Sequence, residues 1–243
     1  MVPLCIVVLW QGLSSLGVFD TSMIPSPLSV LAAGASAMRS GELTRHVGIS
    51  VLRVVRGFLA AAIAGVTLGL ALGWIPLLRT LIGPLLHFLR QIPPVAWIPV
   101  FIMWFGIGES SKISVVTYAA FFPILLNTET AAAQISGNYL ELGRAFQFTS
   151  FQVLTRIIVP GSLGPVFTGL RLGLSNSWRA LVAAEMLASA GGLGYMIVLS
   201  RELVQPDVMF LGIIVLGLLG YAVDAGALRL QKRLAPWSLS LRT

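Results

Sequence analysis

Five long stretches of this chain carry no charged side chain, and they limit its fold more than any other feature. The charge-free stretches are residues 1–19, 57–78, 91–108, 113–128 and 208–223. A sixth apolar region, residues 166–187, contains Arg171, Arg179 and Glu185. A helix needs about 20 apolar residues to cross the hydrocarbon core of a bilayer, so we predict an all-α polytopic membrane protein with about six transmembrane helices. These helices should form a single transmembrane permease domain over residues 1–243.

The composition excludes other classes of protein. The 243 residues are 56% hydrophobic and only 10% charged, whereas soluble domains are about 45–50% apolar and about 25% charged. The strands of a transmembrane β-barrel alternate apolar and polar residues, but these stretches are apolar on every face. The net charge of +7 fits arginines and lysines that flank membrane spans. No basic stripe alternates with aromatic residues, so we expect membrane lipid, and no nucleic acid, as a partner.

The segments between the predicted spans contain prolines and one helical period. We expect residues 20–40 to form a loop, because prolines there break helices. Residues 74–90 also hold prolines and are expected to be a short connection. Residues 41–57 show a helical period and should approach the second span along the membrane interface. His46 in that segment is expected to be a surface histidine.

One polar and charged segment, residues 138–165, interrupts the apolar sequence. Residues 139–146 are predicted to form a first short helix. A second helix should begin at residues 149–152, Thr-Ser-Phe-Gln, where the threonine hydroxyl and the glutamine amide can form a capping box. Such a pair of helices suits a groove on a soluble partner, or it can lie on lipid headgroups.

Apolar and charged side chains are sorted along this polar segment. In its second helix Phe151, Leu154 and Ile158 are predicted to form an apolar stripe that ends at Pro160. In its first helix Glu141 and Arg144 lie three residues apart and can pair. The basic C-terminal tail favours a cytoplasmic position for this segment and for the C-terminus, with residues 109–112 outside. We interpret the segment as a docking surface at the cytoplasmic face.

Two ionisable side chains fall within the sixth apolar region, and both need an explanation. Arg171 precedes Glu185 by 14 residues, close to four helical turns, so both lie on one face about 21 Å apart. A charge at membrane depth costs at least about 2.5 kcal/mol. We predict a translocation path or gate formed by Arg171, Asn176, Trp178 and Glu185. The carboxylate would pair with an arginine of a second copy or with a backbone amide; the alternative is a structural ion pair between helices.

Motifs for nucleotide or metal chemistry fail on inspection. Residues 106–112 read GIGESSK and lack the G-K-[ST] of a phosphate loop, so we expect this chain to bind no cofactor and to hydrolyse no ATP itself. Only two histidines, His46 and His87, are present, and no H-E-x-x-H occurs. Cys5 is the single cysteine, so no metal site is expected. Asp224 is expected near the cytoplasmic end of the last span, beside Arg229.

The polar segment resembles the loop of bacterial ABC importer permeases that docks on the ATPase, with the pattern E-A-A-x3-G-x9-I-x-L-P. The matching positions are Glu141, Gly143, Ile157, Val159 and Pro160. Other stretches resemble the taurine, alkanesulfonate and nitrate branch of that family: RQIPPVAWIP at residues 90–99, WFGIGE at 104–109 and VAAEM at 182–186.

The segment departs from the family pattern at three positions, one of which is Gly164 in place of a usual proline. Gln147 stands where the family has the loop glycine, and Leu142 replaces the first alanine. Glycine permits a tight turn between two helices. Gln147 therefore needs either a turn at ordinary φ or a left-handed conformation that costs about 1 kcal/mol.

The resemblance implies a type I ABC importer permease fold with residues 138–165 as its cytoplasmic coupling loop. The ATPase-coupling residues would be Glu141, Gly143, Arg144, Gln147, Phe151 and Pro160. The implied partners are a cytoplasmic ATPase dimer that binds ATP and Mg, a second permease copy as a homodimer, and an external substrate-binding protein. The chain would lie in the bacterial inner membrane and pass a small anion such as a sulfonate or nitrate. A secondary transporter or channel without an ATPase is the alternative, although its inverted repeats are not evident.

Overall fold

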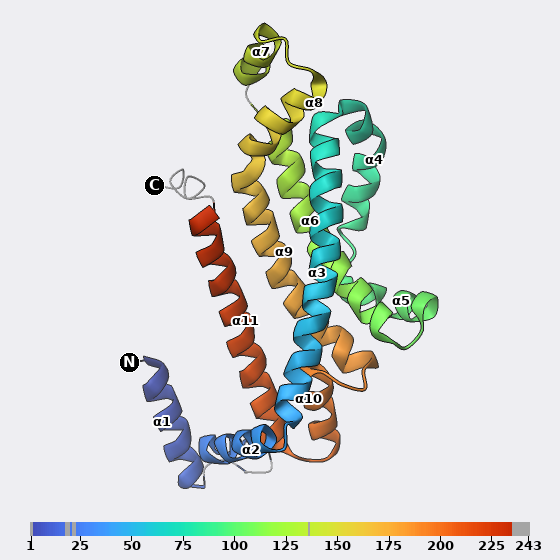
Figure 1. The fold of residues 1–243 in the computed structure, drawn as a ribbon. Coiled ribbons are helices and arrows are strands. Elements are labelled where there is room, and N and C mark those ends of the chain that lie inside the picture. Colours follow the sequence, from blue (N-terminus) through green and yellow to red (C-terminus); the bar gives the residue numbers. More distant parts are fainter. Residues whose placement is uncertain (1, 18–19, 21–22, 136, 235–243) are drawn as a thin grey trace. The chain divides into compact units, whose positions relative to one another are not determined.

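The computed structural model describes residues 2–17, 20, 23–135 and 137–234, and all regular structure within these ranges is helical (Figure 1). The chain divides into two compact units. Unit 1 comprises Met1–Arg53 and Leu181–Tyr221, and unit 2 comprises Val54–Ala180 and Ala222–Thr243. The all-α prediction is therefore confirmed for the described residues.

Unit 1 begins with two helices, α1 (Val2–Ser15) and α2 (Pro27–Arg39). The prediction of a loop over residues 20–40 is wrong, because Pro27 occupies the first turn of α2, where a proline is tolerated. The Ser26 side chain accepts a hydrogen bond from the Ser29 amide and caps the helix. The 14 residues of α1 span about 21 Å, less than the roughly 30 Å hydrocarbon core. The first predicted span is thus only a short apolar helix in the described residues.

The long helix α3 (Glu42–Trp74) corrects the expected interfacial approach. Residues 41–57 do not lie apart from the second span, because they form the first half of the same continuous helix. Its 33 residues cover about 50 Å. Later in the chain follow the helices α9 (Val159–Ala188), α10 (Leu193–Glu202) and α11 (Pro206–Leu234).

The chain after α3 is helical where a simple connection was predicted. Helix α4 (Pro76–Leu89) begins with a proline in its first turn, and Pro84 lies inside it. A 3-10 turn, η1 (Pro94–Trp97), then leads into α5 (Ile98–Phe105). The axis bends by 90° between α4 and this second segment. The third predicted span, residues 91–108, is therefore part of a bent pair, as Figure 1 shows.

Three helical runs are long and apolar enough to cross a membrane: Glu42–Trp74, Ser150–Leu187 and Pro206–Arg233. The bent pair makes a fourth if it counts as one span. Helix α6 (Glu109–Ala133) contains the predicted span 113–128, and its 25 residues cover about 37 Å. Its charged and hydroxyl side chains lower its mean hydropathy. The polytopic prediction is confirmed, while six uniform spans are not found.

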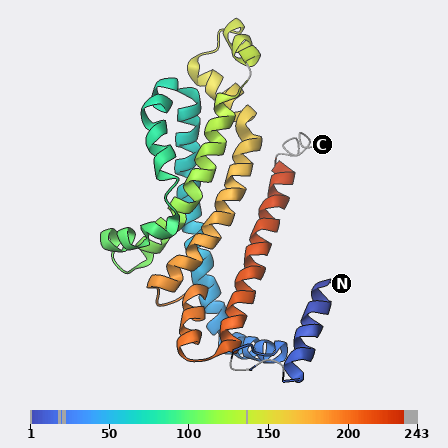
Figure 2. The same cartoon turned by 180° about the vertical axis from the view of Figure 1, so that it is seen from behind.

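Helix α6 lies between α3 and α9 in unit 2 (Figure 2), and glycines bring the three backbones together. Six glycines of α3 and α9 face α6, and a methyl group added at any of the six would come within 3.0 Å of α6 atoms. The glycines on α3 are Gly57, Gly65, Gly69 and Gly73, and those on α9 are Gly169 and Gly173. Small residues allow such close approach between membrane helices. Ala61, Ala120 and Ile124 form a fully buried cluster beside this seam.

The polar segment forms the link from α6 to α9. It contains α7 (Gly137–Ala145), the single turn α8 (Ser150–Val153) and a π-helical turn, η2 (Leu154–Ile158). Helix α9 (Val159–Ala188) follows without a break. The prediction that Pro160 ends the helix is wrong, since Pro160 lies in the first turn of α9.

Candidate functional site

The polar segment, residues 138–165, which we call the coupling loop after its predicted role, has the two predicted helices and the predicted cap. The Thr149 hydroxyl accepts a hydrogen bond from the Gln152 amide at 3.3 Å. The Gln152 side-chain oxygen accepts one from the Thr149 amide at 2.8 Å. This reciprocal capping box fixes the start of α8. The entry to the second helix is therefore set by local sequence.

In the turn between the two helices, Gln147 adopts the left-handed conformation rather than a turn at ordinary φ. Its φ is +53°, in the left-handed region that favours glycine. The Phe148 amide donates to the Gly143 carbonyl oxygen at 2.9 Å and closes the turn. A left-handed non-glycine residue costs about 1–2 kcal/mol. The turn geometry that the family's glycine would permit is thus kept at a small energetic cost.

Gly143 is buried where α7 meets the second helix. A methyl group there would lie 3.0 Å from Ile157 Cδ1 and 3.5 Å from Val153 Cγ2. Val153 and Ile158 belong to a buried cluster that also holds Ala132. Position 143 therefore needs a small residue because the helices of the coupling loop touch there.

The predicted apolar stripe is only partly exposed. Ile158 is 1% exposed and belongs to the buried cluster, whereas Phe151 is 72% exposed. The apolar side chains that remain open form what we call the docking surface. Its members are Tyr139, Leu142, Phe146 and Phe151. Glu141 is exposed on the same loop, and the side chain of Arg144 lies outside the described residues, so its pairing with Glu141 stays a prediction.

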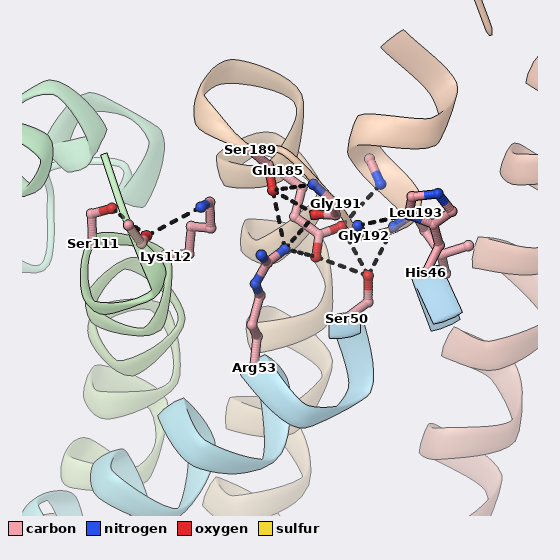
Figure 3. A network of polar contacts seen from close by, with 12 residues as sticks. His46, Ser50, Arg53, Ser111, Lys112, Glu185, Ser189, Gly191, Gly192 and Leu193 are labelled. Atoms are coloured by element: carbon pink, nitrogen blue, oxygen red, sulfur yellow. Dashed lines mark hydrogen bonds and ion pairs between the residues drawn. The ribbon is translucent and has the colours of Figure 1, made fainter. Parts of the chain in front are cut away.

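A second constellation, in unit 1, surrounds Glu185 (Figure 3). The Glu185 side chain is fully buried, and its Oε1 accepts from Arg53 Nη1 at 2.8 Å. The Ser50 hydroxyl donates to the same carboxylate at 2.8 Å, and the Gly194 amide donates to Oε2 at 2.9 Å. The partner is thus an arginine of the same chain, which corrects the pairing expected with a second copy. The expected backbone amide is present.

The same cluster holds the turn that precedes α10. The Gly192 amide donates to His46 Nδ1 at 3.0 Å, and the Leu193 amide donates to the Ser50 hydroxyl at 2.9 Å. Arg53 Nη1 donates to the Gly191 carbonyl oxygen at 2.6 Å. Helix N-termini leave amides without partners, and here side chains of α3 and α9 satisfy them. The Glu185 carboxylate also lies where the helix dipole of α10 favours negative charge.

Three members of this cluster, His46, Ser50 and Arg53, were not predicted from the sequence. His46 is 1% exposed, so its prediction as a surface histidine is wrong. His46, Ser50 and Arg53 are spaced i, i+4 and i+7, which places them on one face of α3. This polar stripe inside a long apolar helix was the signal. Gly192 has φ +111°, and a side chain there would overlap the Glu185 carboxylate.

Arg171 forms a separate pair in unit 2. Its Nε and Nη2 donate to Asp224 Oδ1 and Oδ2 at 2.9 and 2.8 Å. Ser175 adds a hydroxyl hydrogen bond to Asp224 at 3.3 Å. The expected partnership of Asp224 with Arg229 is therefore wrong, and Arg171 and Glu185 each have a partner of their own.

The remaining predicted path residues differ in their surroundings. Trp178 is buried. Asn176 lines a cavity of about 250 Å³ in unit 2, together with Arg90 and Tyr118. Arg90 was expected among the basic residues that flank the spans on the cytoplasmic side, and its place at this cavity is a finding of the structure.

Comparisons with known proteins agree with this fold. Residues 57–236 match the family described as binding-protein-dependent transport system inner membrane component. The taurine transport system permease protein TauC of Escherichia coli (strain K12) is 32% identical over 94% of this chain and 85% of its own length. The nitrate import permease protein NrtB of Synechocystis sp. (strain PCC 6803) is 31% identical over 95% of this chain and 86% of its own length.

A solved structure shows the same fold. The inward-facing MetNI methionine ABC transporter contains a chain with a TM-score of 0.68 and 21% identity, covering 79% of this chain and 95% of that one. The alternative of a transporter or channel that works without an ATPase is set aside by the family match. The chain belongs to the binding-protein-dependent transport system inner membrane components, and it is a permease subunit of an ABC importer in the taurine, sulfonate and nitrate branch.

Proposed function

We propose that this permease subunit imports a small oxyanion, a sulfonate or nitrate, that an external binding protein delivers. The support comes from the taurine and nitrate named for two relatives that match almost the whole chain. We further propose that the working complex contains two copies of this chain and two cytoplasmic ATPase subunits. ATP and Mg would bind only in those ATPase subunits.

The exposed apolar side chains of the coupling loop are the observation that supports docking on an ATPase. Four large apolar side chains of the docking surface are open on two short helices and the turn between them, and Glu141 adds a charge beside them. An amphipathic helix pair of this kind fits a hydrophobic groove in a partner. The ATPase would supply the groove, with Glu141, Arg144 and Gln147 at its rim and Phe151 inside it.

The loop is built to transmit movement. The run from Ser150 to Leu187 is helical throughout, and the capping box fixes its first turn. Within unit 2, a displacement of α8 therefore moves the start of α9 as well. Pro160 and the π-helical turn lie at this junction, and π-bulges are frequent at functional sites. Movement of the ATPase would thus reach α9, which carries Arg171 and Asn176.

The coupling loop and the residue 109–112 turn lie at opposite ends of α6. We place the coupling loop and the C-terminus in the cytoplasm and residues 109–112 outside. Cysteine substitutions at Ser150 and Ser110, labelled from either side of the membrane, test this assignment. Labelling of both from the same side would contradict it.

Two substitutions test the docking surface. We expect Glu141→Lys and Phe151→Asp to reduce recovery of the ATPase with the purified permease while membrane insertion stays normal. Their matched controls are Glu202→Lys, an exposed charge reversal elsewhere, and Phe151→Leu, which keeps an apolar side chain. Normal ATPase recovery with both test variants would show that the ATPase docks elsewhere.

The proposed class of substrate is tested by measuring which solutes the external binding protein binds. Calorimetric titration of the associated external protein with taurine, methanesulfonate and nitrate should give saturable binding for at least one of them. Binding of only cationic or uncharged solutes would refute the oxyanion assignment, and the family assignment would stand.

A further inference from the structure

We propose that the cavity at the bend between α4 and α5 is an anion subsite in the permease itself, which takes the acidic group of the transported solute. We call it the bend cavity and define it by Arg90, Tyr118, Phe122, Leu126 and Asn176, which all belong to unit 2. The proposal rests on the proposed import of an oxyanion.

The bend interrupts a pair of helices that together are long and apolar enough for one candidate span. The Tyr118 hydroxyl donates to the Leu89 carbonyl oxygen at 2.5 Å, at the last residue of α4. The neighbouring Thr117 hydroxyl donates to the Gly57 carbonyl oxygen at 3.2 Å, and Gly57 lies near the middle of α3. The bend therefore lies at the level of Gly57, where the charge-free stretch 57–78 of α3 begins. Irregular backbone within a membrane span is tolerated where it is buried in protein or lines a cavity, and broken helices often frame transport sites.

Whereas the Tyr118 hydroxyl is bonded to the Leu89 carbonyl oxygen, two polar side chains of the bend cavity, those of Arg90 and Asn176, are unpaired within the described part of the chain. Arg90 makes no side-chain hydrogen bond or ion pair there. By contrast, Arg53, Arg79 and Arg171 are each paired with a carboxylate. The side-chain amide of Asn176 likewise has no hydrogen-bond partner among the described residues. Between them, a guanidinium offers five N–H donors and an amide offers two.

These donors select the ligand chemistry. The Arg90 guanidinium is exposed and has no carboxylate partner among the described residues, so its N–H groups are available to an anion. Its planar fork binds two oxygens of a carboxylate, sulfonate or similar oxyanion. The cavity volume of about 250 Å³ is just below the roughly 300–1,000 Å³ of sites for drug-sized ligands. A small oxyanion is therefore the class of solute that fits in size and charge, with the Tyr118 and Phe122 rings beside its apolar part.

The direct test measures protection of a reporter cysteine. In a Cys5→Ser background, which removes the single native cysteine, Leu126→Cys places a thiol at the cavity wall. The permease–ATPase complex is held in phosphatidylcholine nanodiscs without binding protein, and the rate of maleimide labelling is measured with methanesulfonate or with chloride at equal ionic strength. Methanesulfonate should slow labelling and chloride should not.

Arg90 variants then identify the group responsible. Hydrogen bonds to a charged group are worth enough that Arg90→Gln should weaken protection by about tenfold or more. The matched control Arg229→Gln removes an exposed guanidinium of the same unit that does not line the cavity, and it should leave protection unchanged. Equal protection in Arg90→Gln and in the Arg229→Gln control, or no protection in any variant, would overturn the proposal.

An anionic lipid headgroup offers the same oxygen chemistry, so a second arm separates the two sources. The labelling rate is compared in phosphatidylcholine nanodiscs with and without phosphatidylglycerol, in the absence of methanesulfonate. Protection by phosphatidylglycerol alone, with no effect of methanesulfonate in phosphatidylcholine, would make the cavity a lipid site and overturn the proposal.

Transport in proteoliposomes with the binding protein separates this inference from the proposed function. Taurine and nitrate uptake should fall by about tenfold or more in Arg90→Gln, while solute binding by the external protein is unchanged. Arg90→Lys should retain part of nitrate uptake because the charge remains. If the wild-type complex imports neither anion, the proposed function fails. If it imports one and Arg90→Gln does so at the same rate, only the subsite fails.

Discussion

Two arginine–carboxylate pairs of the same chemistry occupy very different surroundings in the two units. The Arg53–Glu185 pair in unit 1 has side chains 4% and 0% exposed. The Arg171–Asp224 pair in unit 2 has side chains 33% and 40% exposed. Both pairs have a shortest nitrogen–oxygen distance of 2.8 Å. Distance alone therefore says little about what each pair contributes.

The difference lies in what else each carboxylate holds. Glu185 also accepts from Ser50 and from the Gly194 amide, so its charge organises the turn before α10. Asp224 is bound by the fork of Arg171 and by Ser175, and it links α9 to α11. Removing one member of a buried pair leaves an uncompensated charge, whereas an accessible pair can find other partners.

The largest effect is expected for Glu185→Ala. It leaves Arg53 buried without its carboxylate, at a cost of about 3–5 kcal/mol. Glu185→Gln should cost less, because an amide keeps the size and some hydrogen bonds. Recovery and melting temperature of the purified complex measure the loss. Normal assembly together with a raised basal ATPase rate would instead favour a gate role for Glu185.

A double substitution sharpens the comparison. Arg53→Met with Glu185→Leu removes both charges, so it should be less destabilising than Glu185→Ala by more than about 1 kcal/mol. The single variants Arg53→Met and Glu185→Leu and the double variant form a thermodynamic cycle, and melting curves give the stability of each. A double variant as unstable as the sum of the singles would show that the charges act independently of each other.

A smaller effect is expected for the accessible pair. Asp224→Asn should cost about 0.6 kcal/mol and at most about 1.7 kcal/mol, the range measured for hydrogen bonds between membrane helices. Arg171→Gln serves as its partner in a second cycle. A loss as large as that of Glu185→Ala would remove the distinction between the two pairs.

The smallest change in stability is expected for a substitution in the turn of the coupling loop. This substitution serves as a reference for the effects at the two ion pairs. Gln147→Gly relieves the left-handed strain but adds chain entropy, so stability should change by less than about 1 kcal/mol. Melting temperature and ATPase recovery should both stay close to wild type. A marked loss of ATPase recovery would show that the Gln147 side chain itself contacts the ATPase.

Local sequence predicted those features that depend on neighbouring residues. The capping box at Thr149, the two helices of the coupling loop and the all-α fold follow from spacing alone. The prolines misled the prediction, because Pro27 and Pro76 lie in first turns, where a missing N–H costs nothing. Pro160 lies inside a continuous helical run, directly after the π-helical turn. Proline therefore marks where a helix begins in this chain as well as where one breaks.

Pairings between distant residues were beyond sequence reasoning. Asp224 lies 53 positions from Arg171, and Arg53 lies 132 positions from Glu185. No local period links such residues, so the packing of whole helices decides their partners. The polar stripe of α3 was visible in the sequence, but its partner was not.

The contacts between the glycines of α3 and helix α6 also show in which direction the two helices run. Along α3, Gly57, Gly65, Gly69 and Gly73 meet residues 116, 124, 128 and 132 of α6, a constant difference of 59 positions. Both numbers rise together, so the two helices point the same way. Parallel neighbours require the chain between them to return, and only α4, η1 and α5 lie in that interval. The bent pair must then bring the chain back from the end of α3 to the level of Gly57, and the coupling loop emerges on the side where α3 ends.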